Sequence, residues 1–255
     1  NAISAASATF TATDTAAPTV SLTTTALVFS GAFTVTATFS EAVTGFVVGD
    51  VTVANGTPSN FATTSSSVYT FDVTPAASGA VTVDIAGSVA IDTAGNNNTA
   101  ATQLSVTYDG VAPTVALATT ASIFSGAFTV TATFSEAVTG FVVGDVTVAN
   151  GTPSNFATTS SSVYTFDVTP AASGAVTVDI AGSVAIDTAG NNNTAATQLS
   201  VTYDGVAPTV ALTGPSGIVA ADFTVTATFS EAVTGFAVGD ITVANGTASA
   251  LVATN

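Results

Sequence analysis

The chain repeats itself with very few changes, and this repeat limits the folds open to it. The segment that begins Ala17-Pro18-Thr19-Val20 begins again at Ala112 and a third time at Ala207, so the period is 95 residues. Residues 17–111 and 112–206 differ at four positions: Ser21 against Ala116, Thr23 against Ala118, Leu27 against Ser122, and Val28 against Ile123. Self-similarity of this kind predicts a row of structurally equivalent units.

Within each unit, apolar and polar residues alternate with a period of two. The segment Phe33–Phe39 alternates apolar residues with three threonines, and the same alternation returns at 69–73, 81–85 and 104–108. Such alternation predicts half-buried strands, and clusters of Gly, Pro, Asn and Asp separate these segments as turns. No segment shows a convincing helical period. Roughly seven short strands in about 100 residues predict an all-β fold of tandem immunoglobulin-like β-sandwiches.

The repeat divides the chain into four segments. Residues 17–111 and 112–206 are two complete repeats, and residues 207–255 correspond to the first half of a third repeat. Residues 1–16 correspond to the tail, or last strand, of an upstream repeat. The core of the half repeat cannot close by itself. We expect it to be completed by the rest of a longer polymer of units or by strands from a neighbouring molecule.

Three short motifs in fixed order resemble a known family. They are Ser40–Phe46, Gly49–Gly56 and Asp92–Asn96, which read SEAVTGF, GDVTVANG and DTAGN. They are similar to the bacterial Ig-like domains repeated in tandem in large secreted adhesins and biofilm-associated surface proteins, and the similarity covers essentially the whole chain. The resemblance implies an extracellular stalk at the cell surface, commonly stiffened by calcium. It identifies no binding target, since such units usually extend a protein and leave recognition to other regions.

The charge composition excludes several classes of function. The chain has 255 residues with 16 Asp and Glu but no Lys, Arg, His or Cys, which gives a formal charge of −16 at pH 7. It therefore has no cationic side chain to pair with nucleic acid phosphates or an anionic membrane surface. It also has no thiol nucleophile, imidazole base or nitrogen or sulfur ligand for zinc. No apolar run approaches the roughly 18 residues of a membrane helix, so we expect no membrane insertion.

Catalysis is disfavoured because only carboxylates, hydroxyls and amides are available. No pair of carboxylates has a context that assigns it as the acid and base of a glycosidase. A carbohydrate-binding module is disfavoured as well, because the four Tyr and most Phe fall on core-facing strand positions. We therefore expect a non-enzymatic protein.

Acidic residues gather where sandwich topology brings one unit to the next. The loop after the Phe33–Phe39 strand and the loop before the Gln103–Tyr108 strand both return to the N-terminal pole, where the preceding linker also arrives. Clustered oxygen donors suit a hard cation such as Ca²⁺, which takes about 6 to 8 oxygen ligands. We therefore predict structural calcium sites at the junctions. The predicted ligands are Asp14, Glu41, Asp92, Asn96 and Asn98, then Asp109, Glu136, Asp187, Asn191 and Asn193, and the incomplete pair Asp204 and Glu231.

A simpler interpretation of the same residues stays open. Asp92 and Asn96 lie in a Gly-containing turn, where Asp side chains cap backbone amides, and Glu41 is then only solvated. Turn chemistry and cation binding are compatible for individual residues. Among the other acids, Asp50 and Asp145 follow a glycine in strand-like segments where a bulge is expected, and they are either peripheral ligands or solvated. Asp72 and Asp84 fall on the polar phase of their strands and are interpreted as solubilising charges.

Two functions follow as alternatives. The first is the rigid stalk of a bacterial surface adhesin, in which tandem units project a recognition domain. The second is a subunit of a self-assembling extracellular filament, sheath or surface layer, in which units pack across cation bridges. Both make neighbouring repeats or other copies of the chain its partners. Any host or surface ligand is expected to bind regions outside this chain.

Overall fold

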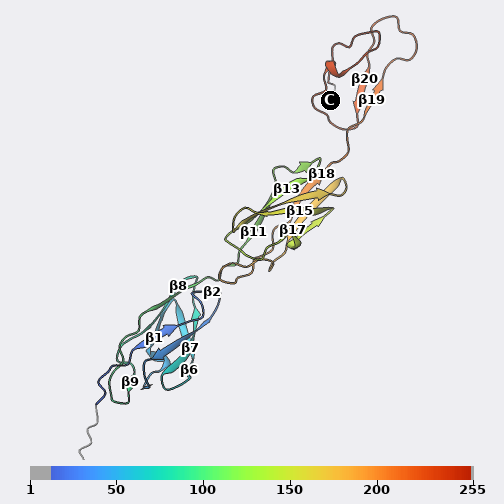
Figure 1. Ribbon diagram of the computed structural model, residues 1–255. Coiled ribbons are helices and arrows are strands. Elements are labelled where there is room, and N and C mark those ends of the chain that lie inside the picture. Colours follow the sequence, from blue (N-terminus) through green and yellow to red (C-terminus); the bar gives the residue numbers. More distant parts are fainter. Residues whose placement is uncertain (1–12, 254–255) are drawn as a thin grey trace, which may run out of the picture.

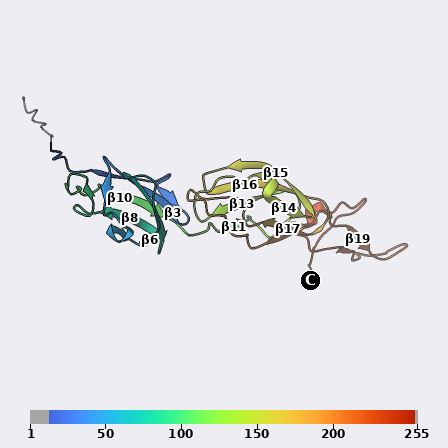
Figure 2. The same ribbon diagram turned by 90° about the horizontal axis from the view of Figure 1, so that it is seen from below.

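A computed structural model describes residues 13–253, so residues 1–12 of the expected upstream tail, residues 1–16, lie outside the described residues. The described part is built from strands and short 3₁₀ turns. Its units follow one another along an extended molecule, as Figure 1 and the perpendicular view in Figure 2 show. This arrangement confirms the all-β fold of tandem sandwiches that the repeat and the alternation predicted.

Each complete unit is a sandwich of two four-stranded sheets. In unit 1 the strand orders are β1-β3-β7-β6 and β2-β10-β8-β5, and a small pair, β4 with β9, closes one pole. Neighbouring strands are antiparallel except β2, which runs parallel to β10. The strands are β1 (Val20–Thr23), β2 (Val28–Phe29), β3 (Phe33–Phe39), β4 (Val43–Thr44), β5 (Val51–Ala54), β6 (Gly56–Thr63), β7 (Val68–Pro75), β8 (Gly79–Ile85), β9 (Ile91–Asp92) and β10 (Leu104–Tyr108).

Unit 2 repeats this architecture. Its sheets have the orders β11-β13-β16-β15 and β12-β18-β17-β14. Isolated bridges from Ile186 to Thr139 and Asn192 take the place of the strand pair β4 and β9. The strands are β11 (Val115–Ala118), β12 (Ile123–Phe124), β13 (Phe128–Phe134), β14 (Val146–Ala149), β15 (Gly151–Thr158), β16 (Val163–Pro170), β17 (Gly174–Ile180) and β18 (Leu199–Tyr203). The near-identical sequences of units 1 and 2 therefore fold in the same way.

Each complete unit has its own hydrophobic core. The apolar phase of β3 is buried and its threonines are exposed or half-buried, as the alternation predicted. Val35 on β3 and Phe71 on β7 are fully buried between the two sheets. The buried residues of units 1 and 2 form two separate clusters that share no member. The free energy that holds each sandwich together is therefore generated within the unit.

Aromatic side chains pack together at the end of unit 1 where the preceding linker arrives. Phe39, Phe46 and Tyr69 meet edge to face, with ring centroids 5.2 to 5.8 Å apart. The Tyr69 hydroxyl donates a hydrogen bond of 3.0 Å to the carbonyl of Val43. This buried bond holds the loop after β3, which carries Glu41, against the core.

Two acidic residues have structural roles that differ from the expected ones. Asp50 ends the 3₁₀ turn η1 (Val48–Asp50), where its carboxylate accepts a 2.9 Å hydrogen bond from the Val47 amide, so the bulge expected there is wrong. Asp72 accepts hydrogen bonds from Thr34 Oγ1 at 2.7 Å and Asn60 Nδ2 at 2.9 Å. These bonds lower the pKa of Asp72, which therefore ties three strands together as well as carrying charge.

The third unit contains β19 (Val210–Thr213), β20 (Thr226–Phe229) and the turn η3 (Val238–Asp240). Its strands pair in the same register as β1 with β3. Val225 corresponds to the fully buried Val35, yet half of its surface is exposed. Within the described residues, the half repeat therefore presents the inner face of a sandwich without an opposing sheet.

Candidate metal centre at the unit junctions

The linker that enters each unit comprises residues 14–19 before unit 1 and residues 109–114 before unit 2. Hydrogen bonds hold it against the N-terminal pole of the unit. At unit 1, Ser40 exchanges two hydrogen bonds with Thr19, through its amide at 2.9 Å and its Oγ at 3.0 Å. The Thr99 amide donates to the carbonyl of Pro18 at 2.8 Å. Ser135 and Thr194 make the equivalent bonds to the linker of unit 2. The linker therefore reaches the loops that carry the predicted acids.

A tight turn holds the buried acid of each site. Asp92 ends β9, and its Oδ1 accepts hydrogen bonds of 2.8 Å from the amides of Ala94 and Asn96. Gly95 has a φ of +92°, which a residue with a side chain adopts only with strain. The spacing Asp92-Thr93-Ala94-Gly95-Asn96 is therefore the spacing of a self-capped Asp turn, as the simpler interpretation expected. Asp187 and Gly190 repeat this turn in unit 2.

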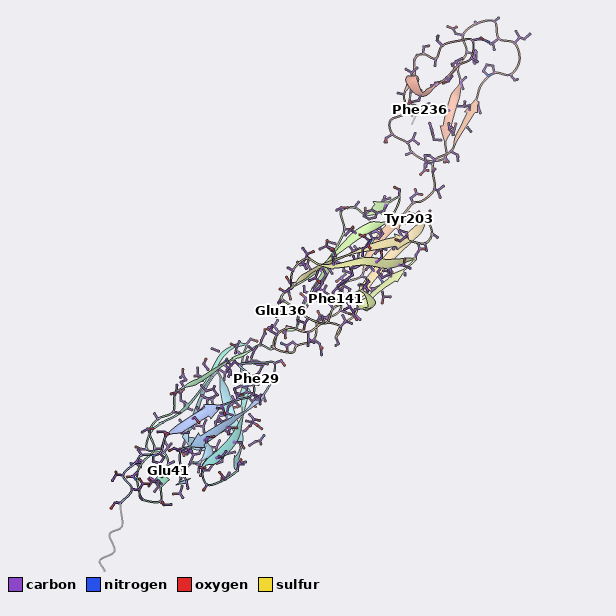
Figure 3. The ribbon with its side chains drawn as sticks, in the orientation of Figure 1. Phe29, Glu41, Glu136, Phe141, Tyr203 and Phe236 are labelled. Carbon is purple, nitrogen blue, oxygen red and sulfur yellow. The ribbon has the colours of Figure 1, made fainter. Side chains whose placement is uncertain are left out.

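Strand pairing then brings a second acid to this turn. Val43 pairs with Asp92 across β4 and β9, and Glu41 lies two residues before Val43. One oxygen from each of Asp14, Glu41 and Asp92 lies within 4.8 Å of the others, and Asp109, Glu136 and Asp187 form the same group in unit 2. Figure 3 shows Glu41 and Glu136 at corresponding ends of their units, with Glu136 facing unit 1. Each cluster thus joins the linker, the loop after the third strand and the self-capped turn.

The remaining predicted ligands divide into two groups. Asn96 and Asn191 lie beside the clusters, because their Nδ2 atoms donate to Asp92 and Asp187 at 2.8 Å. Asn98 and Asn193 are buried, and both ends of each amide are already bonded to backbone groups of their own unit. Asp204 and Glu231 belong to no group of three acids among the described residues.

The linker is also fixed to the unit that it leaves. The Gly110 amide donates to Ser78 Oγ at 3.0 Å, and the Val111 amide donates to Asp109 Oδ1 at 3.1 Å. A Cβ at Gly110 would collide with the Tyr108 ring and hydroxyl, so a larger residue here would have to push the Tyr108 side chain aside. Sequence reasoning missed this contact, although the spacing Tyr-Asp-Gly recurs at Tyr203. The backbone beside Asp109 is therefore fixed to unit 1, and the Val111 amide orients the Asp109 carboxylate within the linker.

The site perturbs its carboxyl groups in opposite directions. Partial burial, followed by the nearby charges of Asp14 and Asp92, raises the pKa of Glu41 above its ordinary 4.5. Glu136 is raised in the same way by burial, Asp109 and Asp187. Hydrogen bonds from Asn96 lower the pKa of Asp92. At Asp187, burial raises the pKa, but hydrogen bonds from Asn191 and three backbone amides outweigh it. Without a cation, the glutamate is the least favourable charge at each junction.

These shifts predict how stability depends on pH when a chelator is present. A raised carboxyl pKa means that the folded chain holds protons more tightly than the unfolded chain, so stability falls as pH rises above 4.5 through the folded pKa of Glu41 and Glu136. The lowered pKa of Asp92 and Asp187 stabilises the fold above 3.8, and this contribution is lost at lower pH. Calorimetric scans should give a higher midpoint near pH 4.5 than at pH 7. A midpoint that rises from pH 4.5 to 7 would contradict this assignment.

Comparison with known proteins identifies the family. A family model described as a bacterial Ig-like domain matches residues 14–108, 109–203 and 204–255. The chain therefore belongs to the bacterial Ig-like domain family, which confirms the resemblance carried by the three sequence motifs. Each match begins at an Asp of a predicted junction, namely Asp14, Asp109 and Asp204. No match was found among curated proteins.

Several solved structures are similar to this chain at low identity. The Escherichia coli adhesin FdeC is 16% identical with a TM-score of 0.42, over 87% of this chain and 77% of FdeC. Invasin, a bacterial integrin-binding protein, is 14% identical with a TM-score of 0.38, over 75% of this chain and 40% of invasin. InvD of Yersinia pseudotuberculosis is 16% identical with a TM-score of 0.35, over 78% of this chain and 63% of InvD. Across residues 13–253, no helix has the length and apolar character of a membrane span.

Proposed function

We propose that this chain is a rigid, non-enzymatic stalk segment of an extracellular bacterial surface adhesin, and that calcium at the junctions keeps its units in line. The observation that carries the proposal is the convergence of three carboxylates at each junction from three separate segments of chain. One of the three, Asp14 or Asp109, comes from the linker. A cation held by all three would bind the linker directly to the next unit.

The chemistry of the donor set fits a hard divalent cation. Each cluster offers only oxygen atoms, and its three carboxylates carry more negative charge than one such cation neutralises. Ca²⁺ prefers oxygen ligands, takes about 6 to 8 of them and tolerates irregular geometry. Asp109, Glu136 and Asp187 would hold the ion at the second junction. The bound ion would supply the positive charge that no side chain of this protein supplies.

The arrangement of the units supports a stalk. Each complete unit has a separate core, and the linker is hydrogen-bonded to the units on both sides of it. A methyl group at Gly190 of unit 2 would lie 3.6 Å from Ser30 Oγ of unit 1, so the two poles come close to each other. When identical junctions repeat along a chain, each unit takes the same orientation relative to the unit before it. Recognition of a host or surface ligand would then belong to regions outside residues 1–255.

Removal of calcium tests this function. In a chelator, we expect a lower melting temperature and a broader distribution of angles between units, because three like charges at each junction then repel without a counterion. Differential scanning calorimetry and small-angle scattering of the whole chain measure the two effects. Unchanged melting and unchanged scattering would contradict the proposal. Fibres in negative-stain micrographs would instead favour the self-assembling filament.

A further inference from the structure

One amide group spans each junction. Asn191 Nδ2 donates a hydrogen bond of 2.8 Å to Asp187 Oδ2 in its own unit and another of 2.8 Å to the carbonyl of Asp109 in the linker. Asn96 makes the same two bonds to Asp92 and Asp14, at 2.8 and 3.1 Å. Both hydrogens of a single NH₂ group therefore join the linker to the self-capped turn.

The neighbouring asparagines show that this arrangement is specific to one position in the loop. The Asn193 side chain bonds only to backbone groups of unit 2, through Val184, Ala185, Ala181 and Thr194. Asn192 is exposed and bridges to Ile186 through its backbone. Among the contacts of the described residues, Asn191 is the only one of these three consecutive asparagines whose side chain bonds to the linker.

We propose that Asn96 and Asn191 are positioning residues that hold the linker against the next unit when no cation is bound. The NH₂ group places one hydrogen on a carboxylate of the acidic cluster and the other on the backbone carbonyl of the linker Asp, and thereby offsets part of the repulsion that the three carboxylates create. A hydrogen bond to a carboxylate is roughly twice as strong as a neutral one, and the lowered pKa of Asp187 reflects it. Without calcium, the junction therefore loses less of its orientation than it would if this amide made no hydrogen bonds.

The clamp and calcium would compete for the carboxylate of Asp187. A cation among Asp109, Glu136 and Asp187 would repel the amide hydrogens, so Asn191 would turn its amide and present Oδ1 to the ion. This exchange rests on the proposed function, whereas the clamp in the cation-free state does not. A variant that loses the amide donors but keeps an oxygen at this position would therefore weaken the junction in chelator and have little effect in calcium.

A distance measurement across the junction tests the clamp. The chain has no cysteine, so Thr74→Cys and Thr169→Cys, at exposed positions of β7 and β16, place one spin label in each complete unit. Double electron–electron resonance then gives the distribution of distances between units 1 and 2. Asn191→Asp keeps the shape of the side chain but removes both donors. Asn192→Asp adds the same charge one residue away and is the matched control.

In chelator, we expect the distributions of the parent chain and of Asn192→Asp to be somewhat broader than in calcium, and those of Asn191→Asp and Asn191→Ala to be much broader still. Loss of two hydrogen bonds lowers the docked population relative to the undocked one by about 10-fold or more. Calcium should return Asn191→Asp to the parent width. A distribution for Asn191→Asp in chelator that is no broader than that of the parent chain would overturn the clamp. A broad distribution in both chelator and calcium would support the clamp and contradict calcium stiffening.

Discussion

Replacing Phe71 with Ala should split the thermal unfolding of the chain into two separate transitions. Phe71 is fully buried in the core of unit 1 and has no contact with the core of unit 2. Removing a buried Phe costs about 3 to 5 kcal/mol, because apolar contacts are lost and a cavity is left behind. For a domain of this size, such a loss lowers the midpoint by on the order of 20 °C.

Scanning calorimetry measures this effect, and the repeat supplies its controls. In the parent chain, units 1 and 2 should unfold independently but at the same temperature, because their cores are identical in sequence. Phe166→Ala makes the same change in unit 2 and should give the same split. Leu27→Ala, at a position 64% exposed, should change stability by no more than about 0.5 kcal/mol. One shared transition that moves as a whole in Phe71→Ala would show that the units are not independent.

The effect of Glu136→Gln on the melting temperature should change sign when calcium is added. In chelator, the variant removes the charge that burial and its two acidic neighbours disfavour, so the melting temperature should rise. In calcium, the variant loses a charged ligand, so the gain from the ion should disappear at that junction. With a dissociation constant of about 10⁻⁴ to 10⁻³ M, about 10 mM calcium stabilises each site by roughly 1.4 to 2.7 kcal/mol.

The half repeat provides a matched control for this variant. Glu231 occupies the same position in unit 3 but belongs to no cluster of three acids in the described chain. Glu231→Gln should therefore change the melting temperature of units 1 and 2 in neither condition. A fall in the melting temperature of Glu136→Gln in chelator would contradict the like-charge explanation. Calcium stabilisation that survives in Glu136→Gln would contradict its role as a ligand.

The alternation of apolar and polar residues predicted the central strands, because each of these strands buries one face and exposes the other. The phase of β3, β7 and β8 follows from burial of one face against a single core. The edge strand β6 was not predicted, because Pro58 and a bulge near Asn60 interrupt its period. Asn60 lies within this bulge with a φ of +50° and donates a hydrogen bond to Asp72, a contact that the sequence pattern does not reveal. Edge strands lack the two-sided packing that creates a clear pattern.

The acidic clusters were predictable because topology alone determines which loops share a pole. The direction of each side chain was not, since it depends on the local turn. Asn96 and Asn98 are two residues apart, yet the turn at Gly95 aims one amide at the linker and the other into its own unit. The contact of Tyr108 with Gly110 was missed for the same reason, because the sequence shows the two residues but not the bend between them.

A calorimetric titration with calcium tests the junction sites most directly. At pH 7 we expect two sites for each chain, formed by the clusters around Glu41 and Glu136, with dissociation constants of about 10⁻⁴ to 10⁻³ M. Glu136→Gln should remove one site, and the double variant Glu41→Gln/Glu136→Gln should remove both. Heats that never saturate, or two sites that survive in the double variant, would contradict calcium binding at the junctions.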